Sequence, residues 1–92
     1  MHEWEIIYLA TALADARKLD AQDRSIIERS VDTKLKRDPE TFGKPLCQVL
    51  SHYRVFRAGD WRVVFRLKEN RILIGTIRHR REGYQGIENR FV

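Results

Sequence analysis

Arginine dominates the residues of this chain that could do chemistry, and it is concentrated in the second half. Residues 47–92 carry ten Lys or Arg and four Asp or Glu, a balance of 10 − 4 = +6, and nine of the ten are arginine. Residues 1–46 carry eight basic and nine acidic residues, a balance of 8 − 9 = −1. Guanidinium is permanently charged and grips phosphate through two hydrogen bonds, so this asymmetry indicates a polyanionic partner, with RNA the leading candidate.

Two side chains that could transfer protons stand near these arginines. His79 and Tyr84 flank the basic pair Arg80-Arg81. RNA carries its own nucleophile, because the 2′-hydroxyl attacks the adjacent phosphate once its proton is removed, provided that the charge on phosphorus is stabilised and the leaving 5′-oxygen is protonated. Arginine can supply the charge stabilisation, and His79 or Tyr84 can move protons. If the last two predicted strands pair with each other, His79 and Tyr84 are expected to lie beside Arg62. The sequence therefore permits RNA cleavage without a metal.

Other kinds of site find little support in the sequence. There is no glycine-rich phosphate loop, no HExxH motif and no cluster of cysteine and histidine. The four carboxylates of the basic half are a poor supply of ligands for a two-metal nuclease. The single cysteine, Cys47, excludes an internal disulfide, and its apolar neighbours favour a buried side chain over a nucleophile. We therefore expect no metal and no cofactor.

Hydrophobic periodicity predicts the elements that must position these groups. Residues 4–8 (WEIIY) are aromatic and β-branched, which predicts a short opening strand. Residues 10–19 place leucine and alanine at helical spacing, and a second helix is expected to begin at the N-cap Asp20 and to end near Arg37. Asp38-Pro39 then stops this helix, because the residue before a proline avoids the helical region, and a loop is expected to follow.

The second half changes to the period-two pattern of β-strands. Three strands are predicted, joined by tight turns at Gly59-Asp60 and at residues 68–70: residues 49–57, 61–68 and 71–79. The middle strand alternates cleanly, with one apolar face made of Trp61, Val63, Phe65 and Leu67. We therefore predict that Arg62 and Arg66, on the other face, point away from the helices.

The order β-α-α-β-β-β predicts an α+β fold, with two N-terminal helices on one face of a small, mostly antiparallel sheet. A chain of 92 residues suffices for one domain with one modest core, so residues 1–92 are expected to form a single unit. No apolar run approaches the roughly 20 residues that cross a bilayer, and the N-terminus lacks the pattern of a secretory signal. We expect a cytoplasmic protein with no membrane partner.

Two segments of the basic half together resemble the signature of the RelE/ParE toxin superfamily. They are residues 53–65 (YRVFRAGDWRVVF) and residues 77–84 (IRHRREGY). The upstream segment around Gly43 and Pro45 also resembles the family's loop before its second strand. The resemblance covers nearly the whole chain, from about Trp4 to Tyr84, and implies a RelE-like fold of the microbial-RNase type.

What the resemblance implies is a type II toxin–antitoxin toxin, more RelE-like than ParE-like. RelE-like members cleave mRNA in the ribosomal A site without a metal, by 2′-hydroxyl attack. Matched by position, Arg62 would stabilise the phosphate, Arg80 would stabilise charge or protonate the leaving group, and Tyr84 would orient a base or move a proton. His79 occupies a tail position that is basic in many relatives. Further RNA contacts are expected from Arg54, Arg57, Arg66 and Arg81.

The residue that would remove the 2′-hydroxyl proton is left open by the sequence. RelE-type toxins place lysines in the second strand, one of them a proposed general base, whereas residues 49–57 hold two arginines and no lysine. Arginine is not deprotonated near neutral pH. Proton abstraction would then fall to His79, Tyr84 or His52, and histidine suits neutral pH best.

The resemblance also implies partners and rival activities. A cognate antitoxin would cover the basic surface, and the complex would bind promoter DNA only through the antitoxin. A ParE-like member would instead poison DNA gyrase without cutting RNA, and a degenerate member would survive as an inert binding partner. The basic and aromatic tail, which holds His79, Arg80, Arg81 and Tyr84, favours the nuclease.

Overall fold

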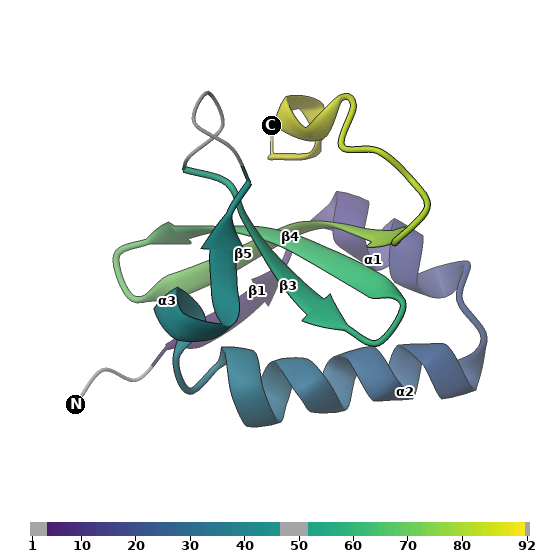
Figure 1. Cartoon of the computed structure of the whole chain (residues 1–92), viewed down its shortest axis with the longest axis horizontal. Helices are drawn as coiled ribbons and strands as arrows, with labels where there is room; N and C mark the ends of the chain where they lie inside the picture. Colours follow the sequence, from purple (N-terminus) through teal and green to yellow (C-terminus); the bar gives the residue numbers. More distant parts are fainter. Residues whose placement is uncertain (1–3, 47–51, 92) are drawn as a thin grey trace.

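Five strands form one open sheet in the order β1-β5-β4-β3-β2 in the computed structural model, which describes residues 4–46 and 52–91 (Figure 1). Along the chain the elements are β1 (Glu5–Tyr8), α1 (Ala10–Arg17), α2 (Ala21–Ser30), a π-helical continuation (Val31–Leu35), α3 (Pro39–Phe42), β2 (Gly43–Pro45), β3 (Arg54–Ala58), β4 (Trp61–Lys68), β5 (Arg71–His79) and a 3₁₀ helix, η2 (Ile87–Phe91). All neighbouring strands are antiparallel except β1, which runs parallel to β5. The predicted α+β class is confirmed. Cys47 lies outside the described residues, as does the beginning of the strand predicted over residues 49–57.

Local sequence signals set the boundaries of the second helix as predicted. The Asp20 carboxylate accepts a hydrogen bond of 2.8 Å from the backbone N–H of Asp23, which caps α2. After the π-helical turn the chain leaves the helix, and Asp38 caps the next one by accepting from the backbone N–H of Thr41. Pro39 takes the first position of α3, where its missing N–H leaves no intrahelical bond unmade. The predicted stop at Asp38-Pro39 is confirmed.

Helix α3 and strand β2 escaped prediction, because the segment after Pro39 was expected to be a loop. Strand β2 pairs with β3 from Gly43 opposite Phe56 to Pro45 opposite Arg54. Three residues that include a proline carry no period-two signal, and proline is tolerated there because β2 is an edge strand. The sheet therefore has five strands in place of the predicted four.

The main core lies between the helices and one face of the sheet. Its fully buried members come from both layers: Ala12, Ile27, Val31, Leu35, Val63, Phe65, Ile72 and Ile74. Burying each such aliphatic or aromatic side chain contributes about 1.5–3 kcal/mol. The predicted alternation of β4 is confirmed, because Val63 and Phe65 face this core whereas Val64 belongs to a second cluster.

The second face of the sheet is partly covered by the C-terminal segment. This segment crosses the sheet on the side opposite α2 (Figure 1). Ile87 is fully buried there with Val64 and Tyr53, and Phe91 packs against this second cluster. The two N-terminal helices lie on the other face of the sheet, as predicted. Toward the turn that joins β3 and β4, the side chain of Arg57 is exposed.

A bulge interrupts the β4–β5 ladder at Gly75. Val64 pairs with Thr76 while the next residue, Phe65, pairs with Ile74, so Gly75 is an extra residue in β5. Its missing side chain matters, because a Cβ atom there would overlap the ring of Phe91. The bulge reverses which residues of β5 face the helices from this point to the end of the strand.

Beyond the bulge, α1 replaces β1 along the edge of β5. Strand β1 pairs with β5 only as far as Tyr8 opposite Ile74. The carboxylate of Asp15 then accepts from the backbone N–H of Ile77 at 3.0 Å, and the Thr11 hydroxyl donates to the carbonyl oxygen of Gly75 at 2.7 Å. Side chains of α1 thus satisfy backbone groups that a strand would otherwise pair. No helix in the described part of the chain is both long and apolar enough to cross a bilayer.

Candidate functional site

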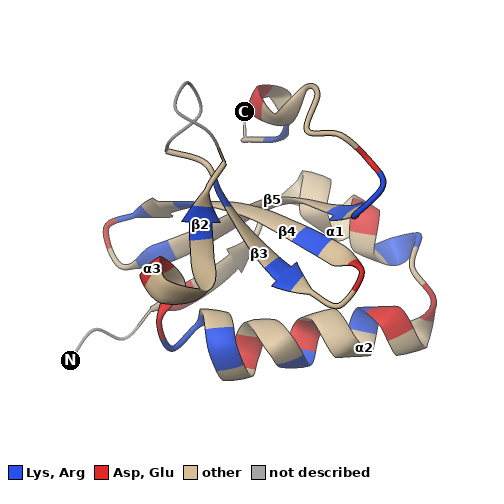
Figure 2. Cartoon of the chain, viewed as in Figure 1, with Lys and Arg blue, Asp and Glu red and all other residues tan. Residues whose placement is uncertain are grey.

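Three arginines on three neighbouring strands form a single row across the sheet. Arg57 of β3 stands opposite Arg62 of β4, and Arg62 stands opposite Arg78 of β5. Residues directly opposite each other project from the same face, so this row lies on the face away from the helices. Figure 2 shows basic bands side by side on β3 and β4 near the turn that joins them. Adjacent strands lie about 4.8 Å apart, a spacing at which several guanidinium groups can reach one phosphate.

The three guanidinium groups are held to different degrees. Arg57 is exposed, and its side chain makes no hydrogen bond or ion pair with residues 4–46 or 52–91. Arg62 donates from Nη1 to the carbonyl oxygens of Gly59 at 3.1 Å and Trp61 at 3.2 Å. Both arginines therefore keep N–H groups that can donate hydrogen bonds to an anion. The two bonds of Arg62 also fix its position beside the turn.

Arg78 is fixed at two points. Its Nη1 donates to the carbonyl oxygen of Gly83 at 2.6 Å, and its Nε lies 3.4 Å from the hydroxyl of Thr76. The first bond ties the end of the arginine row to the segment that carries Tyr84. Arg78 therefore contributes both charge and the placement of the tail.

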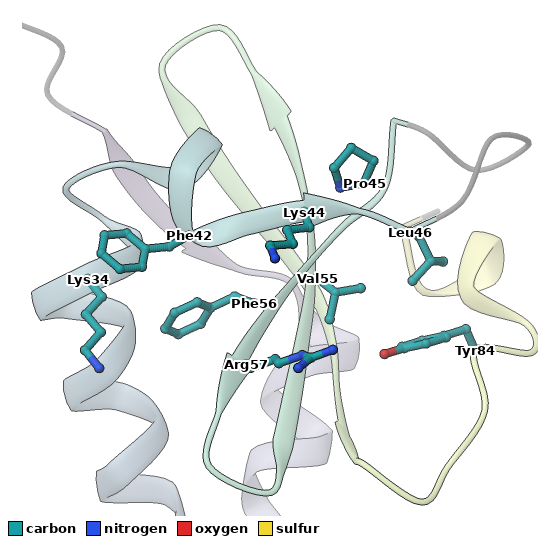
Figure 3. A pocket seen from close by; sticks show the side chains of 9 residues that line it. All are labelled: Lys34, Phe42, Lys44, Pro45, Leu46, Val55, Phe56, Arg57 and Tyr84. Carbon is teal, nitrogen blue, oxygen red and sulfur yellow. The ribbon is translucent and has the colours of Figure 1, made fainter.

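Beside the row lies a groove of about 450 Å³, one wall of which is Tyr84 (Figure 3). The Tyr84 hydroxyl points across Val55 toward Arg57. Lys34 and Lys44 add two more cations to the lining, and Phe42, which is 43% exposed, adds a second aromatic ring. No Asp or Glu lines the groove among the described residues. Its positive charge and aromatic walls suit an anionic, base-bearing ligand.

His79 does not join this group. It stands opposite Trp61, on the face of the helices, and the two rings meet edge to face with centroids 5.2 Å apart. Its Nδ1 accepts a hydrogen bond of 3.2 Å from the backbone N–H of Arg81. That nitrogen is occupied, and the ring projects from the face opposite Arg62, so the expected juxtaposition of His79 and Arg62 is wrong.

Two other predicted RNA contacts lie away from the row. Arg54 donates from Nη2 to the carbonyl oxygens of Glu40 at 3.0 Å and Gly43 at 2.8 Å, which ties β3 to the segment before it. It lies three residues from Arg57 on the same strand, and therefore on the opposite face. Arg66 lies over the ring of Tyr53, with its central carbon 5.5 Å from the centroid. Four residues of strand place it about 13 Å from Arg62.

Two basic residues, Arg80 and Arg81, follow β5. Arg80 lies beside the Gly59-Asp60 turn, with its Nε 3.6 Å from a carboxylate oxygen of Asp60, and both side chains are more than half exposed. An ion pair this exposed contributes little to stability and is readily exchanged for another anion. Arg81 is exposed. His52, the remaining candidate base, lies against Tyr53 at the other end of β3 from Arg57.

Sequence reasoning missed Arg78, Lys34 and Lys44. The bulge explains the first, because simple alternation along β5 places Arg78 on the face of Ile72 and Ile74, whereas the extra residue moves it to the opposite face. A glycine inside a predicted strand is a known signal of a bulge, and Gly75 could have raised it. Lys44 was missed because β2 was missed, and Lys34 because it comes from the far end of the second helix.

Within residues 4–46 and 52–91, no group of three or more His, Cys, Asp or Glu side chains is placed to hold a metal ion. The arrangement can bind an anion through several guanidinium groups and hold an aromatic base beside it. What it offers for chemistry is charge stabilisation by arginine and proton transfer by the Tyr84 hydroxyl.

A family of toxins and two solved structures resemble this chain. A sequence profile described as "ParE toxin of type II toxin-antitoxin system, parDE" matches residues 6–84. No curated protein sequence matches the chain. The toxin–antitoxin complex RelBE2 from Mycobacterium tuberculosis superposes with a TM-score of 0.78 at 24% identity, covering 84% of this chain and 98% of that one. YafQ from E. coli strain BL21(DE3) superposes with a TM-score of 0.55 at 16% identity, covering 83% of this chain and 92% of that one. At these identities the two structures establish the shared fold.

Proposed function

The chain belongs to the family of ParE toxins of type II toxin–antitoxin systems, and from that premise we propose that it is a metal-independent, ribosome-dependent mRNA endoribonuclease. The reaction is attack of an RNA 2′-hydroxyl on the adjacent phosphorus. The 2′-oxygen loses its proton as it bonds to phosphorus, and the bond to the 5′-oxygen breaks as that oxygen gains a proton. The products are a 2′,3′-cyclic phosphate and a free 5′-hydroxyl.

The observation that carries the proposal is the row Arg57, Arg62 and Arg78. Attack on the phosphate places additional negative charge on its non-bridging oxygens, and fixed guanidinium donors stabilise that charge most where they are already in place. Arg62 occupies the middle of the row and is oriented by its bonds to two carbonyl oxygens. We assign it the scissile phosphate, with Arg57 and Arg78 on either side.

The groove beside the row would hold the neighbouring nucleotide. Tyr84 and Phe42 offer aromatic surfaces for a base, which suits single-stranded RNA, whose bases are free to stack. Lys34 and Lys44 offer charge to a flanking phosphate. A strand laid in this way would cross from β4 to the edge formed by β2 and β3.

Proton transfer is assigned to Tyr84. Its hydroxyl points toward Arg57 of the row (Figure 3). The other two candidates lie elsewhere, since His79 stands opposite Trp61 and His52 lies against Tyr53. Arg80, at the end of the row and in an exposed pair with Asp60, is retained as a charge-stabilising group.

A second activity is favoured by the description of the matching family, which is that of ParE toxins. A gyrase inhibitor of this kind would bind its protein target and would leave RNA intact. In either case a cognate antitoxin is the expected partner, since type II toxins are paired with one, and one of the superposed structures is itself a toxin–antitoxin complex. Promoter DNA would then be bound only through the antitoxin.

The proposal is tested by inducing the chain in growing cells. Primer extension is then carried out on a reporter transcript, with and without ribosomes. The wild type should arrest growth and leave new 5′ ends, whereas Arg62→Ala should restore both growth and intact transcripts. Arg29→Ala is the matched control, because Arg29 is an exposed arginine on α2, far along the chain from the row. Growth arrest with intact transcripts and broken chromosomal DNA would instead identify gyrase as the target.

A further inference from the structure

Asp15 of α1 is bonded to three groups that lie along β5 and the C-terminal segment. One carboxylate oxygen accepts from the Thr76 hydroxyl at 2.8 Å and from the backbone N–H of Ile77 at 3.0 Å. The other accepts from Nη2 of Arg90 at 2.5 Å. The Asp15 side chain is only 16% exposed, so these bonds form largely out of water, where each is stronger. The bonds to Ile77 and Arg90 are explained by the fold. The bond to Thr76 is not.

Thr76 is the one polar side chain in the buried core of the described residues, with 1% exposure. A carboxylate can only accept hydrogen bonds, so the Thr76 hydroxyl hydrogen must point to Asp15. The lone pairs of the same oxygen are then directed away from Asp15, and Nε of Arg78 lies 3.4 Å from that oxygen as a donor. Asp15 therefore sets the direction in which Thr76 can accept.

Arg78 receives its orientation from this arrangement. With Nε directed at Thr76 and Nη1 at the carbonyl oxygen of Gly83, two of its three nitrogens are fixed. Nη2 has no partner among the described residues and stays available on the face of the arginine row. The side chains from Asp15 to Arg78 thus connect a helix on one side of the sheet to a phosphate contact on the other.

We infer that Thr76, whose hydroxyl is oriented by Asp15, is a positioning residue that holds the Arg78 guanidinium in line with Arg62; this inference rests on the proposed nuclease function. A guanidinium held in one orientation stabilises the charge of the transition state without reorganising first. The inference assigns no contact between Asp15 and RNA. It predicts a loss in the chemical step when the connection is cut, with binding largely retained.

Thr76→Val and Thr76→Ser separate this role from a structural one. Valine has nearly the shape of threonine but offers Arg78 no acceptor, while Asp15 keeps its bonds to Ile77 and Arg90. With ribosomes programmed with a defined mRNA, Thr76→Val should lower kcat about tenfold with KM within about twofold of wild type. Thr76→Ser should restore kcat. The matched control is Thr11→Val, which removes hydroxyl bonds to Gly75 and Arg90 but none to Arg78.

A second measurement tests the contact between Thr76 and Arg78 in the absence of RNA. The ¹H–¹⁵N signal of Arg78 Nε in the full-length chain should shift in Thr76→Val and stay near its wild-type position in Thr11→Val. An unmoved signal together with wild-type kcat in Thr76→Val would overturn the inference, as would an equal fall of kcat in Thr11→Val. If the wild type cleaves no RNA at all, the proposed function fails, and the response of the Nε signal still decides whether Thr76 positions Arg78.

Discussion

Arg57 of β3 and Arg62 of β4 face each other directly in the antiparallel ladder, on the side of the sheet that the helices leave open. Like charges in such a pair repel and lower the stability of the sheet. Arg62 faces Arg78 on its other side, so the repulsion acts across three strands. No carboxylate at these register positions relieves the repulsion. An arrangement that opposes folding in this way is what a site for a polyanion requires.

Removing the charge of Arg57 should therefore stabilise the protein while it impairs function. We expect Arg57→Gln to raise the free energy of unfolding by about 0.5 kcal/mol in low salt, and Arg57→Lys, which keeps the charge, to leave it near wild type. The gain should shrink at about 1 M salt, where charges are screened beyond roughly 3 Å. Urea unfolding at two salt concentrations checks this. A less stable Gln variant would show that Arg57 makes stabilising contacts of its own.

Lys44 should contribute one phosphate contact to RNA binding. For single-stranded nucleic acid, the slope of log K against log salt changes by about 0.7 for each phosphate contact. We expect Lys44→Ala to flatten the slope by about that amount for a short single-stranded RNA. Lys68→Ala is the control, because Lys68 is exposed at the opposite end of β4 from the row. Equal slopes for wild type and Lys44→Ala would remove the groove from the RNA path.

Gly75→Ala should dislodge the C-terminal segment from the sheet. The added methyl group would overlap the ring of Phe91, and overpacking of this kind costs about 1–3 kcal/mol. Thermal unfolding should show the loss, and amides of residues 87–91 should exchange faster with solvent. Because the clash is with a single ring, Gly75→Ala combined with Phe91→Ala should destabilise the chain by less than the sum of the two single changes. Additive losses would mean that the bulge itself rejects alanine.

Tyr8 should make the protein less stable at high pH. Burial, and then the charges of Asp32 and Glu28, raise the pKa of Tyr8 from 10.0 to about 12. Between these values the unfolded chain has released the proton whereas the folded chain retains it. The free energy of unfolding therefore falls as pH rises through this window, and the contribution is fully present below pH 10. Urea unfolding at pH 8 and pH 11 should show a smaller fall for Tyr8→Phe than for wild type, and equal falls would contradict the assignment.

The fold class and the position of most elements followed from local patterns in the sequence. The cap at Asp20, the stop at Asp38-Pro39 and the turn at Gly59-Asp60 are each governed by residues within a few positions of one another. Local physics decides such features, because a cap or a tight turn depends only on nearby backbone groups. The strand β2 was not predictable in this way, since three residues at an edge acquire strand geometry only from their partner β3.

The membership of the site depended on pairing that no local pattern contains. Period-two alternation correctly placed Arg62. Along β5 the same alternation would put Arg78 on the face of the helices, because it does not account for the extra residue at Gly75. A bulge is a property of two strands taken together, so one strand's sequence can hint at it but cannot fix it. The same holds for Lys34 and Lys44, which reach the groove from elements that were only brought together by folding.

The amino-acid sequence by itself determined the charge of this protein, its arginine-rich strands and its α+β class, since composition and periodicity are carried by each segment alone. The resemblance to a family of toxins is carried by two of its segments, residues 53–65 and 77–84. Tertiary structure decided which of those arginines share a face, that Arg78 and not His79 completes the row, and that Asp15 stands behind it. These depend on strand register and on contacts between residues more than sixty positions apart, which only the folded chain specifies.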